Sequence, residues 1–251
     1  MPETLDKPPP SDKIKKKITE GGILIYLYEL HMHTSEGSAC GKASIHDMIR
    51  RYADLGFSGA VVTDHFLGGN TAVDRSLNWP DTVARYARAY YEGLETAQAL
   101  DFDLLFGVEE GLGYGKEILA YGFQPEFLLE RPFLRRAGAE VWFREVDQAG
   151  GFVAYAHPFR RRDYILDPWA MPDMRFAHGV EVYNRGNTPE DNRRQEEIFC
   201  NSGTILITGS DTHHTNFNDP CGIVLPRRVS TSAQLASHLR TGDFQLSICR
   251  K

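Results

Sequence analysis

Short apolar runs alternate with segments of helical periodicity along most of this chain. The apolar runs predict strands at residues 23–30, 59–63, 103–108, 117–121, 151–156, 179–183 and 204–208, with a short terminal one at 223–225. Helical spacing predicts helices at 44–55, 81–100, 139–149, 189–201 and 232–239. Strands that alternate with helices usually pair in parallel through right-handed crossovers. The pattern therefore predicts an α/β fold, either an open doubly wound sheet or a closed barrel.

The length of 251 residues fits one large domain, and single α/β barrels often have this size. No glycine-rich dinucleotide-binding turn follows the first predicted strand, which removes one reason to prefer the open sheet. Residues 1–22 are polar, with a run of three prolines and a run of three lysines, and predict a leader that precedes a single domain at 23–251.

Charge and cysteine content narrow the classes of function. The formal net charge of -6 argues against a binder of long nucleic acid, which needs a broad basic face. The 4 cysteines are scattered and form no C-x-x-C pair, as expected for reduced thiols in a cytoplasmic protein. No stretch reaches the roughly 20 apolar residues of a membrane span. We therefore expect a cytoplasmic protein that acts on a small molecule and has no membrane partner.

Histidines and acidic residues cluster where the predicted strands end. Such residues are His31, His33, Asp64, His65, Glu109, Glu110, His157, Asp211 and His213. The carboxyl ends of parallel barrel strands converge on one face, where active sites are built. One histidine at a strand end is more often a polar residue with satisfied hydrogen bonds than a metal ligand. For a whole group of histidines and carboxylates at strand ends, that explanation is much weaker. We therefore expect these side chains to form one site.

The residue types indicate metal binding. His31 and His33 lie on the same side of an extended segment, because strand side chains repeat every two residues. Imidazoles mixed with carboxylates suit zinc, manganese or iron. The donors exceed the needs of one four-coordinate ion, which predicts two or three divalent metal ions. Close-set ions need a bridging carboxylate, and Glu109 is the candidate.

Five short motifs in order resemble those of the PHP (polymerase and histidinol phosphatase) family. They are Glu29-Leu30-His31-Met32-His33-Thr34, Thr63-Asp64-His65, Gly107-Val108-Glu109, Ala156-His157-Pro158 and Gly209-Ser210-Asp211-Thr212-His213. The resemblance runs from about residue 28 to residue 214. It implies a distorted (β/α)7 barrel, a single domain with a metal site at the carboxyl ends of its strands.

The resemblance also implies a set of metal ligands. One metal would be held by His31, His33, Glu109 and Asp211, a second with the help of His65 and His213, and a third with the help of Glu109 and His157. The family often has another ligand soon after the first motif, a position that Glu36, Cys40 or a water molecule can fill here. Glu117 stands where many members have a histidine opening the fourth strand. Because Glu117 begins its strand, it reaches the site only if that strand is antiparallel.

The expected activity is hydrolysis of a phosphomonoester or a small phosphodiester by a metal-activated hydroxide, since a metal lowers the pKa of bound water toward ~7. Asp211 belongs to the catalytic set as a ligand, and His65 or His213 would protonate the leaving oxygen. Arg160 would bind phosphate and act in catalysis, because a guanidinium matches a pair of phosphate oxygens. Arg185 and Asn184, after the sixth predicted strand, are further candidates for substrate binding.

Two other functions fit parts of the pattern. A metal-dependent amidohydrolase shares the barrel, the first motif and the late aspartate, but would favour a lysine after the fourth strand, and Lys116 precedes that strand. A non-catalytic module stabilised by metal would have lost ligands, whereas most positions are filled here. The expected partner is a small phosphorylated substrate.

Overall fold

The computed structural model describes residues 25–248, in which nine strands form one sheet. The strands are β1 (Tyr26–Met32), β2 (Gly59–Val62), β3 (Asp103–Gly113), β4 (Lys116–Tyr121), β5 (Phe152–Ala156), β6 (Gly179–Asn184), β7 (Ile205–Gly209), β8 (Gly222–Leu225) and β9 (Gln245–Ser247). The helices are α1 (Ile45–Asp54), α2 (Trp79–Tyr86), α3 (Arg88–Ala99), α4 (Pro125–Leu129), α5 (Ala139–Gln148), α6 (Pro189–Phe199) and α7 (Ser232–Thr241). The leader expected at residues 1–22 lies outside the described residues.

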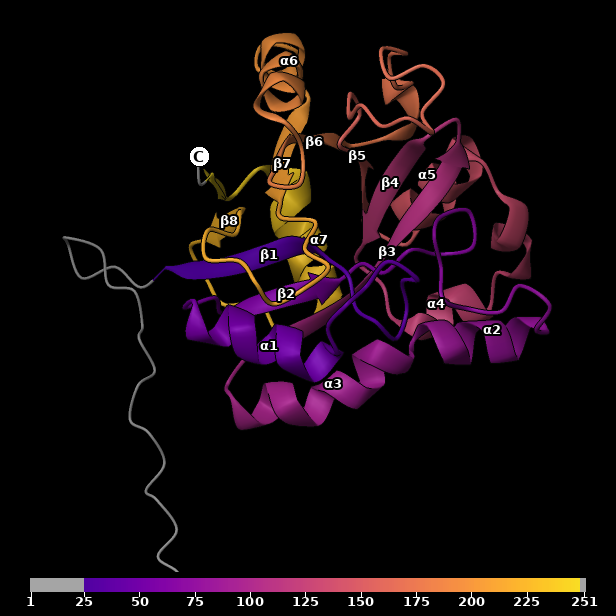
Figure 1. Ribbon diagram of the computed structural model, residues 1–251, viewed down its shortest axis with the longest axis vertical. Helices are drawn as coiled ribbons and strands as arrows, with labels where there is room; N and C mark the ends of the chain where they lie inside the picture. Colours follow the sequence, from indigo (N-terminus) through magenta and orange to yellow (C-terminus); the bar gives the residue numbers. More distant parts are fainter. Residues whose placement is uncertain (1–24, 249–251) are drawn as a thin grey trace, which may run out of the picture.

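The sheet curls into a nearly closed barrel (Figure 1). Its strand order is β7-β6-β5-β4-β3-β2-β1-β8-β9. The segment after β7 returns to β1, where the Asp211 amide donates to the His31 carbonyl over 2.8 Å. The His33 amide donates to the Thr212 carbonyl over 2.9 Å. These bonds join the carboxyl ends of the first and seventh strands, so the residues that follow both strands lie side by side.

The (β/α)7 prediction is correct in its barrel-like α/β architecture and wrong in its strand count and pairing. β4 is antiparallel to both β3 and β5, β8 is antiparallel to β1, and β9 is antiparallel to β8. A tight turn joins β3 to β4, with positive φ at Gly113, Tyr114 and Gly115. This reversal brings the first residues of β4 to the carboxyl edge of β3 and β5, with Glu117 opposite Gly111 and Ala156.

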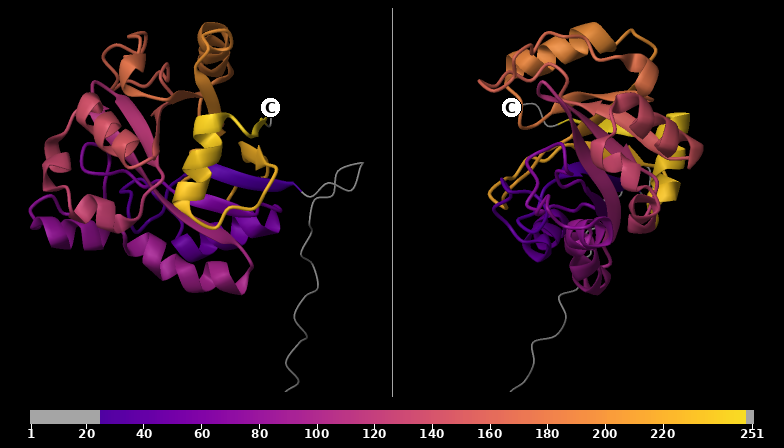
Figure 2. Two further views of the ribbon diagram at one scale, coloured as in Figure 1. Left: turned by 180° about the vertical axis from the view of Figure 1, so that it is seen from behind. Right: turned by 90° about the vertical axis from the view of Figure 1, so that its right-hand side faces the viewer.

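Two layers of apolar side chains hold the barrel together. Inside, residues from β1 to β5, β7 and β8 pack with Leu235, Ala236 and Leu239 of α7. Outside, α1 and α3 cover β1 to β3, while α2, α5 and α6 cover β3 to β6. In Figure 1, α7 lies behind the sheet, and the half turn in Figure 2 brings it to the front. The Ser232 hydroxyl bonds the backbone of Phe106 and thereby fixes α7 to β3.

Other predicted elements need smaller corrections. α1 begins after Ser44, whose side chain accepts from the Asp47 amide as an N-cap. The helix expected at 81–100 is two helices that meet at Ala87, and no proline or glycine marks this break. α4 and β9 were not predicted. Among the described residues, no helix has the length and apolar character needed to cross a membrane.

Candidate metal centre

The two histidines of the first motif lie fully buried at the carboxyl end of β1. His31 Nδ1 is 3.0 Å from a carboxylate oxygen of Glu181, which can only accept, so this nitrogen carries the proton. His33 Nδ1 is 2.9 Å from the Ser38 hydroxyl, which donates its own hydrogen to Asp64. With both Nδ1 atoms held by hydrogen bonds, the Nε2 atoms of His31 and His33, 3.1 Å apart, face the centre of the site.

Glu109 lies among four imidazoles. Its carboxylate oxygens are 3.1 Å from His31 Nε2 and 3.2 Å from His33 Nε2. They are also 2.8 Å from His65 Nδ1 and 3.0 Å from His157 Nε2. Burial raises the pKa of Glu109, but His31 and His65 outweigh it and hold that pKa well below its usual range. An ionised carboxylate that reaches four imidazoles has the position expected of a bridging ligand.

Asp211 and Glu117 lie on two sides of this centre. Asp211 Oδ1 is 3.1 Å from His33 Nε2 and 3.6 Å from His213 Nδ1. Glu117 lies 3.5 Å from both His65 and His157, because the reversed direction of β4 brings it there. Burial raises the pKa of Asp211, and Arg160 and His31 nevertheless keep it well below its usual range. The structure thus brings together all the predicted metal ligands: His31, His33, His65, Glu109, Glu117, His157, Asp211 and His213.

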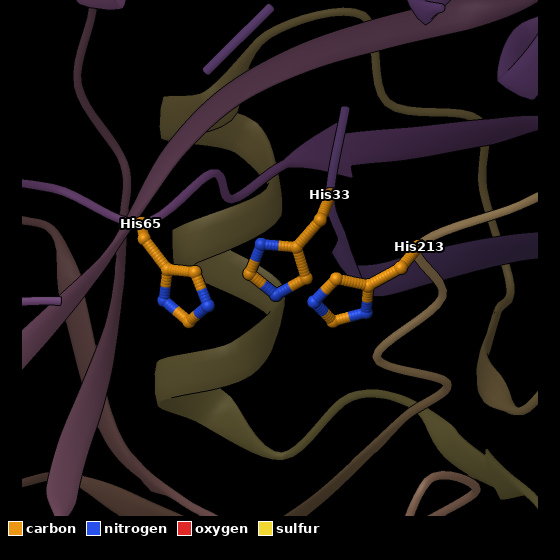
Figure 3. Close-up of side chains that lie close together, drawn as sticks. All are labelled: His33, His65 and His213. Carbon is orange, nitrogen blue, oxygen red and sulfur yellow. The ribbon is translucent and has the colours of Figure 1, made fainter. Parts of the chain in front are cut away.

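Three of the histidines form a group of neighbouring donors that overlaps the rest of the centre. The rings of His33, His65 and His213 come from the end of β1, the segment after β2 and the segment after β7, and they point toward one another (Figure 3). The ring centroid of His33 is 4.4 Å from that of His65 and 4.3 Å from that of His213. His213 Nδ1 donates to the Asp211 carbonyl over 3.0 Å, which leaves its Nε2 for a ligand.

Two of the candidate ligands have unusual backbone conformations. His157 has a backbone φ of 27° and Asp211 a φ of 53°. Residues other than glycine seldom adopt such positive values. Such residues cost of order 1–3 kcal/mol each and persist where their surroundings fix them. The His157 amide donates to Glu181, and the Asp211 amide donates to the His31 carbonyl. The strain therefore occurs where the strand ends turn side chains into the site.

The donor set fits divalent metal ions. His65 Nδ1 and Glu109 Oε2 lie 2.8 Å apart, yet neither atom makes a hydrogen bond of acceptable geometry. Buried polar atoms without a partner are rare, and a bound cation that replaces the proton would satisfy both atoms. Groups of three such donors within 4.8 Å of one another occur four times in the cluster. Imidazoles mixed with carboxylates match zinc, manganese or iron.

Several residues that support the centre were not predicted. Glu181 of β6 is fully buried, holds His31 Nδ1 and accepts from the His157 amide over 2.9 Å. A charged residue within an otherwise apolar strand is the signal that indicates it. Ser38 accepts from the His65 amide over 2.9 Å while it holds His33. Asp64, one of the acidic residues at the predicted strand ends, binds Ser38 and Thr34 and so acts on His33 through Ser38.

The two candidates for the extra ligand differ in position. Glu36 accepts from the Ile45 amide at the start of α1, so its carboxylate caps that helix. The Cys40 thiol lies beside His213 and His65. Burial raises the pKa of Cys40, but hydrogen bonds with these two histidines lower it to about 5. Neither Glu36 nor Cys40 belongs to the four groups of three donors found among the described residues.

The predicted substrate-binding residues lie in two places. The buried Arg160 guanidinium bonds Asn184 over 2.9 Å and Asn187 over 2.8 Å, and it pairs with Asp211. Arg160 and Asn184 are therefore at the edge of the metal centre. Arg185 instead forms an ion pair of 2.7 Å with Asp219. Lys116 donates to the carbonyls of Pro158 and Pro168, so its amine is held by backbone at the base of a loop.

Comparison with known proteins finds solved structures with a similar fold. No protein-family model and no curated protein matches the chain. A solved two-domain protein from Bacteroides vulgatus, described as containing a predicted PHP-like metal-dependent phosphoesterase, matches with a TM-score of 0.65 and 17% identity over 96% of this chain and 70% of that one.

Two further solved structures match as well. PsfC from Pseudomonas syringae has a TM-score of 0.59 and 15% identity, over 90% of this chain and 92% of that one. An amidohydrolase from Chromobacterium violaceum has a TM-score of 0.51 and 16% identity, over 74% of this chain and 87% of that one. The chain therefore shares its fold with a PHP-like phosphoesterase and with an amidohydrolase.

Proposed function

We propose that this protein is a metal-dependent phosphoesterase that hydrolyses a phosphomonoester or a small phosphodiester. The observation that carries the proposal is the buried carboxylate of Glu109 within 3.2 Å of four imidazoles, with a buried arginine paired to Asp211 at the edge of the same cluster. The imidazoles and carboxylates suit cations, and the guanidinium suits an anion. A phosphate ester in contact with both meets these requirements.

The contacts support the assignment of metal ligands that the family resemblance implies. His31, His33, Glu109 and Asp211 would hold one ion. His65 and His213 would help to hold a second, and Glu109, Glu117 and His157 a third. Bound there, two or three divalent ions of zinc, manganese or iron would make water acidic enough to attack at neutral pH and would neutralise the phosphoryl oxygens.

Arg160 and Asn184 would position the substrate. Among the described residues, the Arg160 guanidinium makes its hydrogen bonds through Nε and Nη2, so Nη1 remains for a phosphate oxygen. The amide nitrogen of Asn184 donates to Glu181 over 2.8 Å, which orients its oxygen toward Arg160. His65 or His213 would give a proton to the leaving oxygen. Arg185 remains a weaker candidate, because Asp219 already neutralises it.

A second candidate is hydrolysis of a C–N bond, which the structural likeness to an amidohydrolase favours. One form of that chemistry uses a lysine that bridges two metal ions. Lys116 is poorly placed for this role, because its amine donates to two backbone carbonyls. A third candidate is a metal-stabilised binding module without catalysis. The buried cluster of imidazoles and carboxylates and the strained backbone of His157 and Asp211 favour an enzyme instead.

The test combines metal analysis with activity on one purified sample. A chromogenic phosphomonoester, a phosphodiester and an N-acyl amide are assayed before and after chelation, and metal per chain is measured. His33→Ala removes a ligand, whereas the matched control His46→Ala removes a histidine that bonds Thr96 outside the centre. We expect chelator-sensitive phosphate release that is lost only in His33→Ala. Release from the amide alone would favour the amidohydrolase, and metal without any turnover would favour the binding module.

A further inference from the structure

The segment after β7, which carries two of the candidate ligands, is fastened to α1 by two consecutive side chains of that helix. Arg51 Nε donates to the Phe217 carbonyl over 2.9 Å. The hydroxyls of Tyr52 and Thr212 lie 2.7 Å apart. α1 itself packs against β1 and β2 on the outside of the barrel (Figure 1). A helix outside the barrel therefore restrains the segment that brings two candidate ligands to the centre.

Tyr52 also connects this segment to β1, through the carboxylate of Glu29. The Tyr52 hydroxyl donates to Glu29 Oε2 over 2.8 Å, so it accepts from the Thr212 hydroxyl. The other oxygen, Glu29 Oε1, accepts from the His31 amide over 2.8 Å and from the Ser210 amide over 2.9 Å. All five residues are buried. The hydrogen bonds therefore form one buried network between α1, β1 and the segment after β7.

Asp211 lies between the two residues of its segment that this network holds. Its neighbour Ser210 is bonded by Glu29, and its other neighbour Thr212 is bonded by Tyr52. Its own amide donates to β1. A positive φ in a residue other than glycine persists only where the surroundings fix it, and Asp211 has such a φ. The network supplies restraint on both sides of the strained residue.

We propose that the Tyr52 hydroxyl is a positioning group for Asp211 and thereby contributes to metal affinity from outside the barrel. Its hydroxyl bonds Glu29 and Thr212 and not a candidate ligand. Without that hydroxyl, both partners lose a buried hydrogen bond, which is costly unless the segment moves. Movement of the segment would displace the Asp211 carboxylate from His33. The inference rests on the proposed function insofar as both require metal in the cluster.

A pair of buried tyrosines separates positioning from general stability. Tyr52→Phe removes the hydroxyl and keeps the ring, which packs against Phe57 and Phe217. Tyr28→Phe is the matched control, because Tyr28 is equally buried and its hydroxyl donates to Asp103 at the start of β3, away from the carboxyl ends of the strands. Zinc affinity of the full chain is measured by competition with a chromogenic chelator, and the melting temperature is measured without metal.

We expect a lower melting temperature in both variants, because each loses a buried hydrogen bond. Only Tyr52→Phe should also bind zinc more weakly, by about 10-fold, as is typical when a residue that supports a metal ligand is substituted. Equal zinc affinity in Tyr52→Phe and Tyr28→Phe would overturn the proposal and reduce Tyr52 to a packing residue.

The other end of the hydrogen bond provides an independent check. Thr212→Ser keeps the hydroxyl and should keep the zinc affinity, whereas Thr212→Val removes it and should weaken zinc binding. Tyr52→Phe combined with Thr212→Val should bind zinc no more weakly than Tyr52→Phe alone, because both remove the same bond. Additive losses would overturn the proposal, and chelator-sensitive ester hydrolysis by the unmodified chain would then leave the phosphoesterase function standing. Absence of bound zinc in the unmodified chain would overturn both.

Discussion

Glu181 and His31 are separated by 150 residues in the chain and by 3.0 Å in the structure, where both are fully buried. The carboxylate accepts from His31 Nδ1 and thereby fixes the tautomer that presents Nε2 to Glu109 and Asp211. The second oxygen of Glu181 holds the His157 amide. One residue of β6 therefore orients candidate ligands at the carboxyl ends of two other strands.

The first prediction concerns this carboxylate. Glu181→Gln keeps the shape of the side chain and removes its charge, so His31 loses a partner that raises the basicity of its ring. Substitution of such outer carboxylates typically lowers metal affinity or activity by about 10–100-fold. We expect a decrease of this size in affinity for zinc, measured by competition with a chromogenic chelator. Glu197→Gln on the exposed face of α6 is the control. Equal zinc affinity in the two variants would contradict the role given to Glu181.

A second prediction follows from the close packing behind these residues. A Cβ at Gly209 would lie 2.5 Å from Glu181 Oε1 and 2.5 Å from the His31 Cβ, closer than real contacts allow. Gly209→Ala must therefore displace the Glu181–His31 pair, and overpacking of this kind typically costs about 1–3 kcal/mol. We expect a lower melting temperature together with weaker metal binding.

Gly138→Ala provides the comparison, because a Cβ there meets nothing within 4 Å and φ is -85°. We expect that variant to melt and to bind zinc like the unmodified chain. If Gly209→Ala behaved in the same way, the packing between β6, β7 and β1 would be looser than the structure indicates.

Much of the site could be predicted because it depends on strand periodicity. The i, i+2 spacing of His31 and His33 and the convergence of strand ends are general properties of parallel sheets. Glu181 could not be predicted in the same way, since it lies within a strand and not after one. Its role depends on the pairing of β5 with β6, which no local pattern encodes.

The reversal of β4 is the main departure from the expectation that strands alternating with helices pair in parallel. The Gly-Tyr-Gly turn between two apolar runs is a hairpin signal, and it explains how Glu117 reaches the centre. The break between α2 and α3 has no such signal. β9 was missed because it is three residues long and gains its stability by pairing with β8 at the end of the sheet.

A third prediction tests α7 as part of the barrel interior. Leu235 is fully buried among side chains of the strands, and removal of its isobutyl group leaves a cavity. We expect Leu235→Ala to lower the free energy of unfolding by about 2–5 kcal/mol in urea denaturation. The exposed Leu94 of α3 is the matched control position. Leu94→Ala should change the free energy of unfolding by no more than about 0.5 kcal/mol. A small effect at Leu235 would show that α7 is not essential to the barrel.

The last prediction concerns competition between protons and metal. Burial lowers the pKa of His31 and His65, but Glu109 and neighbouring acidic groups outweigh it, so that the pKa of His31 is raised and that of His65 is raised to about 11. Without metal these imidazoles therefore keep their protons at neutral pH. A metal ligand must be deprotonated, so binding has to expel those protons. Affinity should accordingly rise with pH, whereas a site whose histidines are already neutral would bind metal with an affinity independent of pH.

The measurement is zinc affinity by chelator competition at several pH values between about pH 6 and pH 8.5. In this range the raised pKa values keep His31 and His65 protonated in the metal-free protein. Calorimetric titration in two buffers with different ionisation enthalpies counts the protons released. We expect tighter binding at each higher pH and a positive release of protons, both reduced in Glu109→Gln, which removes the charge that raises the pKa of His31 and His65. Affinity independent of pH, with no release, would mean that the imidazoles are already neutral in the metal-free cluster. The pairing of Glu109 with its four histidines would then be a consequence of packing alone.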